Sequence, residues 1–171
     1  MGKISKNRKG NLLIESIIAL SVATIGILGV LGLLSRSLGI NKDVSQKFAA
    51  TYLAAEGVEV VKSLIDKNFA DSDAWNEGIG DCGFPTCDYE VVFNDAALSG
   101  FSDHFLNFDS TNGTYSYGDG VPTPFKRKIV ITAIDLNGGG DDELKVNSSV
   151  TWAVRGGTET VDLEDHFFDW R

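Results

Sequence analysis

Cys82 and Cys87 are the only cysteines of the chain, and four residues separate them. Such a pair forms a disulfide that closes a short loop when this part of the chain reaches an oxidising compartment. A zinc site is an alternative, but zinc usually takes four protein ligands, and only His104 and His166 could add nitrogen. Free thiols are a third alternative. We expect the disulfide.

A glycine-rich segment carries a second set of residues that could do chemistry. Asp135, Asn137, Asp141 and Glu143 offer the oxygen ligands that Ca²⁺ prefers. The match to the calcium-loop motif is partial, because Gly139 replaces the ligand expected after Asn137 and the spacing to Glu143 is short. These four residues are weak candidates for a calcium site, and a hydrated hairpin tip is the alternative.

Catalysis has little support in the sequence. His104 and His166 lie far apart along the chain, and neither belongs to a recognisable motif. The chain has no glycine-rich phosphate loop and no nucleophile elbow. We therefore expect no enzyme, no catalytic residue, no resident metal and no cofactor.

Charge is distributed unevenly along the 171 residues. The net charge is −9, and the first ten residues carry +4 from Lys3, Lys6, Arg8 and Lys9, so the remainder carries −13. Phosphate recognition needs clustered Lys and Arg. An acidic body therefore argues against nucleic acid as a partner.

An apolar tract runs from Leu12 to Leu34, and Glu15 is its only charged residue. Its 23 residues are enough for a helix to cross the roughly 30 Å of bilayer hydrocarbon. The tract is longer than the core of a secretory signal and lacks a small-residue cleavage site after it, so we expect it to stay in the mature protein. The basic residues before it predict a single pass with the N-terminus in the cytoplasm and the body outside.

Glu15 is the unusual residue of this tract, because a carboxylate within an apolar helix costs several kcal/mol in lipid unless it finds a partner. The alternative is that it lies at headgroup level and reaches water. The run from Lys9 to Glu15, KGNLLIE, closely resembles the signature of type IV prepilins, in which a short basic leader ends in Gly and the fifth mature residue is Glu.

The resemblance implies a role for each residue of the signature. Gly10 would end a leader of residues 1–10 that prepilin peptidase removes, and Asn11 would become the methylated N-terminus. Glu15 would then meet the N-terminal amine of a neighbouring subunit during assembly. The chain departs from the family at Asn11, where Phe is usual. The implied partners are prepilin peptidase, other pilin subunits and the membrane.

A helical pattern continues beyond the membrane tract. We expect a transmembrane and assembly helix over 11–38, with Gly26, Gly29 and Gly32 either loosening it or permitting close packing between helices. An amphipathic helix over 39–68 should follow, with a loosening at Gly39. Its apolar residues form two series at helical spacing, which are Val44, Phe48, Tyr52 and Ala55, and Leu53, Val60 and Leu64.

One segment of this second helix resembles a run found in some minor-pilin-like proteins. The run is AAEGVEVV, which includes Glu56 and Gly57. An ordinary amphipathic helix explains the pattern equally well.

Residues 69–171 are expected to form a globular head. The part from 70 to 124 reads as irregular, with one strand over 89–93. A hairpin of strands over 125–136 and 144–154 and a third strand over 160–163 should follow. The aromatic residues of 167–170 should dock on the head. The predicted fold is α+β, pilin-like, with a long N-terminal helix packed by its second half on a small antiparallel sheet of three or four strands.

The expected function is that of a structural subunit, minor rather than major, of a type IV pilus-like filament or a type II secretion pseudopilus. It would begin as a single-pass protein of the cytoplasmic membrane and end in an extracellular or periplasmic filament. The alternative is a membrane-anchored extracytoplasmic binding or sensor domain with no filament role.

Overall fold

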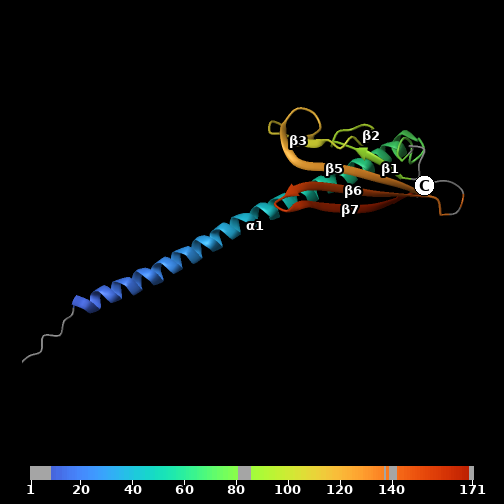
Figure 1. The fold of residues 1–171 in the computed structure, drawn as a ribbon. Coiled ribbons are helices and arrows are strands. Elements are labelled where there is room, and N and C mark those ends of the chain that lie inside the picture. The colour runs from blue at the N-terminus through green and yellow to red at the C-terminus, as the bar shows by residue number, and fades with distance from the viewer. Residues whose placement is uncertain (1–8, 81–85, 137, 139–141, 170–171) are drawn as a thin grey trace, which may run out of the picture. The chain divides into compact units, whose positions relative to one another are not determined.

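The computed structural model describes residues 9–80, 86–136, 138 and 142–169, with side chains from Leu12 onward. One long helix precedes the strands of an antiparallel sheet (Figure 1). The helix is α1 (Lys9–Asp71), and the strands are β1 (Thr86–Glu90), β2 (Ser99–Gly100), β3 (Phe105–Asp109), β4 (Thr114–Ser116), β5 (Val121–Ile134), β6 (Glu143–Val154) and β7 (Gly157–Phe168). The predicted α+β class is confirmed.

Strand β5 is the centre of the sheet. It pairs with β6 along one side and with β1 and β3 along the other, and β2 and β4 extend the sheet from β1 and β3. β7 pairs with β6 alone and forms an edge. Over the described residues the sheet has seven strands, so the prediction of three or four strands was wrong.

The predicted hairpins are confirmed for β5, β6 and β7. Phe125 pairs with Trp152, and Val150 pairs with Val161, so each hairpin places apolar side chains on one face. Gly156 and Gly157 form the second turn, where φ values of 133° and 156° favour glycine. β7 is longer than the predicted 160–163, because its pairing with β6 continues to Phe168.

The region 70–124 is more regular than predicted, because it contains the four strands β1 to β4. The predicted strand over 89–93 was displaced and ends at Glu90. Its end has a local cause, since the Asp95 carboxylate accepts a hydrogen bond from the Val92 backbone at 2.7 Å and the Asp95 backbone donates to Val92 O. This turn removes Val92 from the ladder.

Contacts divide the chain into two compact units, one ending at Ser45 and one beginning at Gln46. In the second unit, the part of α1 from residue 46 onward packs its inner face on the sheet. Two clusters of buried apolar residues form this core: Val60, Val61, Leu64, Ile65, Trp75, Ile79, Val91, Ile129, Ile131, Leu144 and Val146 in one, and Ala50, Leu53, Ala54, Leu106, Phe125, Val150 and Trp152 in the other.

The C-terminal aromatics divide between the core and the surface. Phe167 packs against the first cluster, whereas Phe168 is largely exposed. Trp170 lies outside the described residues. Of the two described aromatics, docking was correctly predicted for Phe167 and wrong for Phe168, and the prediction for Trp170 stays untested.

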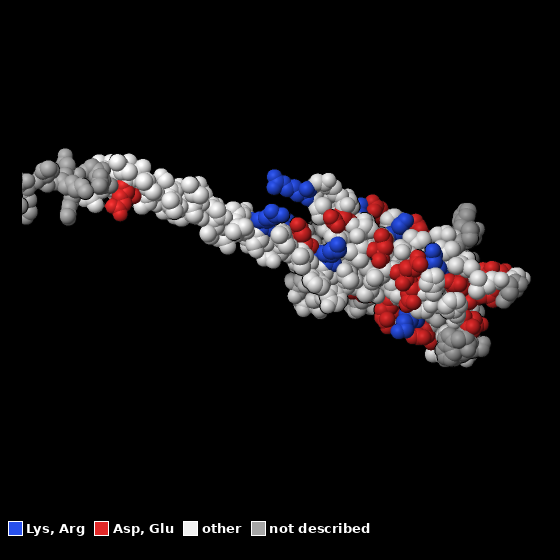
Figure 2. Space-filling view, turned by 90° about the horizontal axis from the view of Figure 1, so that it is seen from below, with Lys and Arg blue, Asp and Glu red and all other residues white. Residues whose placement is uncertain are grey.

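The first unit consists of helix over its described length. α1 continues past Gly39 without a break and past residue 68, the predicted end, to Asp71. Its part from Leu12 is apolar and long enough to cross a membrane. The large apolar side chains from Leu12 to Val44 are all exposed within this chain. In Figure 2 the surface of this helix is uncharged along most of its length, whereas acidic side chains gather over the second unit.

Candidate functional site

The residues that carry the prepilin resemblance lie on α1. Gly10 and Asn11 belong to its first turns by their backbone, and their side chains lie outside the described residues. Glu15 is exposed among apolar neighbours in a shallow depression lined by Ile14, Ile18 and Ala19. None of the described residues forms an ion pair with Glu15. Cleavage after Gly10 and the pairing of Glu15 remain predictions.

In the second unit, α1 lies close to the sheet at Gly57. A Cβ atom added there would lie 2.6 Å from Ile129 Cδ1 on β5 and 2.6 Å from Ser148 Oγ on β6. Real Cβ contacts are longer than this, so a side chain at position 57 would force Ile129 or Ser148 to shift. Ser148 is itself the small residue in an inward row of larger apolar ones on β6. The glycine of the AAEGVEVV run therefore has a packing role.

Arg127 fastens the same turn of α1 to the sheet. Its side chain is fully buried, and its Nη1 donates to Leu53 O at 2.9 Å and to Glu56 Oε1 at 3.0 Å. Its Nη2 donates to the carbonyl of Val91, the residue after β1. A buried guanidinium is tolerated only when paired and hydrogen-bonded. Arg127, Glu56 and Gly57 thus form a junction between helix and sheet, called the junction residues below.

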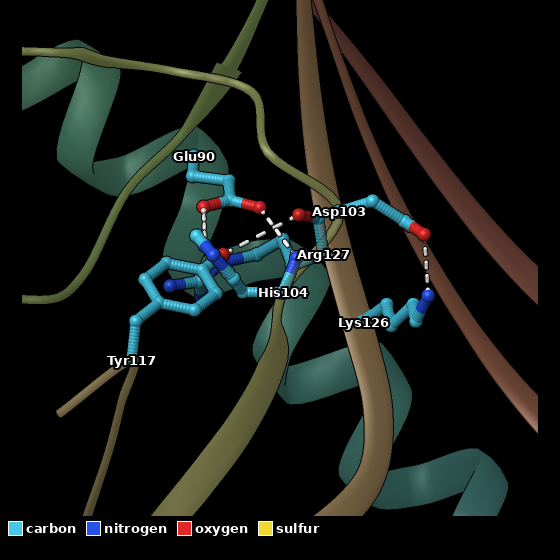
Figure 3. Close-up of polar contacts among 6 residues, drawn as sticks. All are labelled: Glu90, Asp103, His104, Tyr117, Lys126 and Arg127. Atoms are coloured by element: carbon cyan, nitrogen blue, oxygen red, sulfur yellow. Dashed lines mark hydrogen bonds and ion pairs between the residues drawn. The ribbon is translucent and has the colours of Figure 1, made fainter. Parts of the chain in front are cut away.

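A second polar group lies beside the junction (Figure 3). Glu90 is buried, and its two carboxylate oxygens contact the backbone N–H of His104 at 2.8 Å and the His104 ring Nδ1 at 2.9 Å. The Tyr117 hydroxyl donates to Arg127 O at 3.3 Å. Burial raises the pKa of Tyr117 to about 12, against the opposing effect of the Arg127 charge. Glu90 therefore fixes His104 and the chain that leads into β3.

The carboxylate-oriented imidazole of His104 resembles, in chemistry, the arrangement that catalysis and metal binding use. Its neighbours do not complete such a site. Within the described part of the chain, no three His, Cys, Asp or Glu residues gather to hold a metal. Asp103, the acid next to His104 in the sequence, is engaged by Lys126 instead. The contacts between Glu90 and His104 therefore hold the segment before β3 in place.

The calcium candidates are only partly described. Asn137 and Asp141 lie outside the described residues. Asp135 accepts a hydrogen bond from the Gly138 backbone, which stabilises the turn itself. Glu143 contacts His166 across the hairpin. The calcium site therefore stays a weak prediction.

Of the two cysteines, only Cys87 lies within the described residues. Cys87 is buried on β1 and has no free thiol. Cys82 lies outside the described residues. The Cys82–Cys87 disulfide therefore remains a prediction.

Sequence reasoning missed Arg127, although a signal was present. The inward residues of β5 recur at every second position, as Phe125, Ile129 and Ile131 do, and Arg127 is in phase with them. A charged residue in phase with buried positions indicates a buried ion pair. The acid that pairs with it, Glu56, stands next to Gly57 in the sequence.

No protein-family model, no curated protein and no solved structure matches this chain. Its function must therefore be argued from its own residues.

Proposed function

We propose that this chain is a subunit of a type IV pilus-like filament, made as a membrane-inserted precursor and cleaved after Gly10. Prepilin peptidase would remove residues 1–10 on the cytoplasmic side, and the second unit would lie outside the membrane. The filament could be a pilus or a secretion pseudopilus. The motif from Lys9 to Glu15 motivates the proposal. Its main structural support is the exposed apolar surface of α1 between Leu12 and Val44.

The exposed surface of α1 needs a partner. Every large apolar side chain between Leu12 and Val44 is exposed in the isolated chain, which far exceeds the apolar patch a soluble monomer tolerates. Lipid would cover this surface before assembly, and helices of other subunits would cover it in a filament.

The second unit adds support from outside the membrane tract. Of the two apolar series in the amphipathic part of α1, Leu53, Val60 and Leu64 are buried on the sheet. Phe48 and Tyr52 are 63% and 74% exposed. An aromatic pair on the uncovered face of a helix is a typical contact for another protein chain. This series therefore extends the surface available to neighbouring subunits.

Glu15 is the residue that assembly would use. In an apolar bundle its charge would be costly alone, and the N-terminal amine of Asn11 on an adjacent copy would offset part of that cost. The alternative, that Glu15 lies at headgroup level, predicts no effect of its charge on assembly.

The test separates processing from assembly in cells that make the filament. N-terminal sequencing of the wild-type protein should begin at Asn11. Glu15→Gln and Glu15→Val should still be inserted and cleaved, but incorporation into filaments should fall at least about tenfold, the factor that a loss of 1.4 kcal/mol produces. Glu59→Gln, at an exposed carboxylate on the same helix, is the matched control and should assemble normally.

Two outcomes would contradict the proposal. Assembled protein that retains residues 1–10 would exclude cleavage. Normal incorporation of Glu15→Val would show that the charge is not used. A protein that keeps its leader and never enters filaments would favour the membrane-anchored binding or sensor domain.

A further inference from the structure

A pocket lies on the face of the sheet that turns away from α1, where β3, β5, β6 and β7 run side by side. The strand register builds it. Phe105 on β3 pairs with Lys126 on β5, and Lys126 pairs with Thr151 on β6, so the three side chains stand in one row. Ala153 pairs with Thr158 on β7 beside that row. On β5 and β6 these positions alternate with the buried ones that face the helix.

Apolar groups form one part of the lining. The Phe105 ring is 53% exposed and lies beside Pro124 of β5 and Ala153 of β6. Ala153 contributes only a methyl group, so a larger side chain at that position would occupy the pocket. The pocket has a volume of about 290 Å³. Sites for small molecules begin at roughly 300 Å³, so this one has room for a single small ring.

The polar part of the lining offers both donors and acceptors. Ionised Asp103 only accepts, Lys126 only donates, and the hydroxyl groups of Thr151 and Thr158 do both. Lys126 Nζ lies 2.5 Å from Asp103 Oδ2 and 4.6 Å from the centre of the Phe105 ring. Of the residues that line the pocket within the described part of the chain, these two alone carry charge, and their charges cancel. A neutral ligand is therefore favoured over an anion or a cation.

The Asp103 side of the pocket is held in place from behind (Figure 3). Asp103 has a φ of 59°, in the left-handed region that costs energy unless the surroundings impose it. The surroundings do so at the next residue, because the buried Glu90 carboxylate binds both the backbone N–H and the ring of His104. Figure 3 shows His104 directed to Glu90 and Asp103 directed to Lys126. A polar group fixed in this way loses little conformational entropy when a ligand binds.

We propose that this pocket binds one pyranose ring of a neutral glycan. A hexopyranose has an apolar C–H face, and each of its hydroxyl groups both donates and accepts. The C–H face packs on Phe105 and Pro124, and the hydroxyl groups bond to Asp103, Lys126 and Thr151. A phosphate would compete with Asp103 for the ammonium of Lys126. An organic cation would compete with Lys126 for the carboxylate of Asp103.

The test uses the isotope-labelled full chain in micelles of a zwitterionic detergent, because maltoside and glucoside detergents would themselves supply sugar rings. Methyl glycosides of glucose, galactose, mannose and N-acetylglucosamine are titrated separately, and the amide NMR shifts are followed. At least one glycoside should shift the amides of 103–105, 126 and 151–153 saturably, with a Kd of about 0.1–10 mM. Inorganic phosphate and methylammonium are the charged controls and should not saturate these shifts.

Variants on the open face of the sheet separate the pocket from the surface around it. Thr151→Val removes one hydroxyl group at nearly constant shape and should weaken binding about three- to tenfold. Ala153→Leu should fill the pocket and abolish binding. Ser149→Ala, at the preceding outward position of β6 and outside the lining, is the matched control and should bind as the wild type does. Unchanged amide shifts away from the pocket show that each variant is folded.

Three results would overturn the proposal. They are the absence of saturable shifts with all four glycosides, wild-type binding by Ala153→Leu, and saturation by phosphate or methylammonium instead of a sugar. N-acetyltyrosinamide is the probe for a peptide ligand, and saturation by it alone would also overturn the proposal. These measurements need neither cleavage after Gly10 nor filament assembly, so the sugar site and the proposed function can fail separately.

Discussion

The two parts of α1 belong to one helix and have opposite surroundings. From Leu12 to Val44 its large apolar side chains are exposed, and Glu15 has no charged partner among the described residues. From Gln46 onward one face is buried on the sheet, and Glu56 is paired with the buried Arg127.

The different surroundings of the two parts of α1 show that the spacing of apolar residues does not identify the partner of a helix face. A helical pattern of apolar residues predicts that a face will be covered, but it does not say by what. The residues of α1 that do not fit the apolar pattern indicate what covers each part of the helix. Gly57 and Glu56 meet partners within the chain, at Ser148 and Arg127. We expect that Glu15 meets its partner outside it.

Removing Arg127 should break the covered part of the helix and leave the exposed part unchanged. Arg127→Ala loses the pair with Glu56 and the hydrogen bonds that the guanidinium donates to the carbonyls of Leu53 and Val91, so the free energy of unfolding of the second unit should fall by about 3–5 kcal/mol. Denaturant unfolding of the full chain, followed by tryptophan fluorescence, measures this.

Lys128→Ala is the matched control for that prediction. Lys128 is one residue along the same strand, on the outward face, and pairs with Asp88 at 3.2 Å. Its loss should change stability by less than about 1 kcal/mol. Equal effects of the two substitutions would mean that burial of the guanidinium is unimportant.

Two glycines of α1 should respond to alanine with opposite signs. At Gly57 the new methyl group meets Ile129 and Ser148 in a filled core, which costs about 1–3 kcal/mol, whereas the gain in helix propensity is about 1 kcal/mol. Gly57→Ala should therefore destabilise the second unit by about 1 kcal/mol.

Gly39→Ala provides the opposite half of that comparison. Apart from its chain neighbours and the backbone of its own helix, no described atom lies within 4 Å of a Cβ placed at Gly39, so only the propensity gain remains and local helix stability should rise by up to about 1 kcal/mol. Hydrogen exchange along α1 reports both changes. The contrast fails if Gly57→Ala stabilises its segment as well.

The smallest effect is expected at Tyr117, beside the junction residues. The pKa of Tyr117 is raised from about 10 to about 12 in the folded state. The contribution of its neutral hydroxyl to the free energy of unfolding is therefore fully present below pH 10 and is lost as the pH rises toward 12. Tyr117→Phe should cost about 0.5–1 kcal/mol at neutral pH through loss of the hydrogen bond to Arg127 O. Its stability should then fall less steeply in alkali.

Alkaline denaturation of the two proteins, read together with tyrosinate absorbance, checks this. Parallel stability curves above pH 10 would show that the Tyr117 hydroxyl ionises as freely in the folded state as in the unfolded one.

Long elements were predictable from the sequence because their patterns repeat many times. α1 and the hairpins of β5, β6 and β7 carry enough turns or alternations to exclude other patterns. β2 and β4 contain two and three residues, which is too few for any periodicity to be read. Their pairing is set by neighbouring strands, and no local signal encodes it.

The candidate site was predictable only where its signal is local. Gly10 and Glu15 are five positions apart and could be read together. Arg127 and Glu56 are 71 positions apart, and their meeting depends on how helix and sheet pack. The contact of His166 with Glu143 depends on the register of a hairpin, which the positions of its turn residues alone do not determine.

Strand β7 leaves one side of the sheet without a further strand over the described residues. A free edge of this length invites another chain to continue the ladder. Along it stand four acids, Glu159, Asp162, Glu164 and Asp165. If the β7 edges of two copies came together, these acids would repel one another. The two sheets should therefore not pair edge to edge, even at high local concentration. A layer of water should separate neighbouring heads.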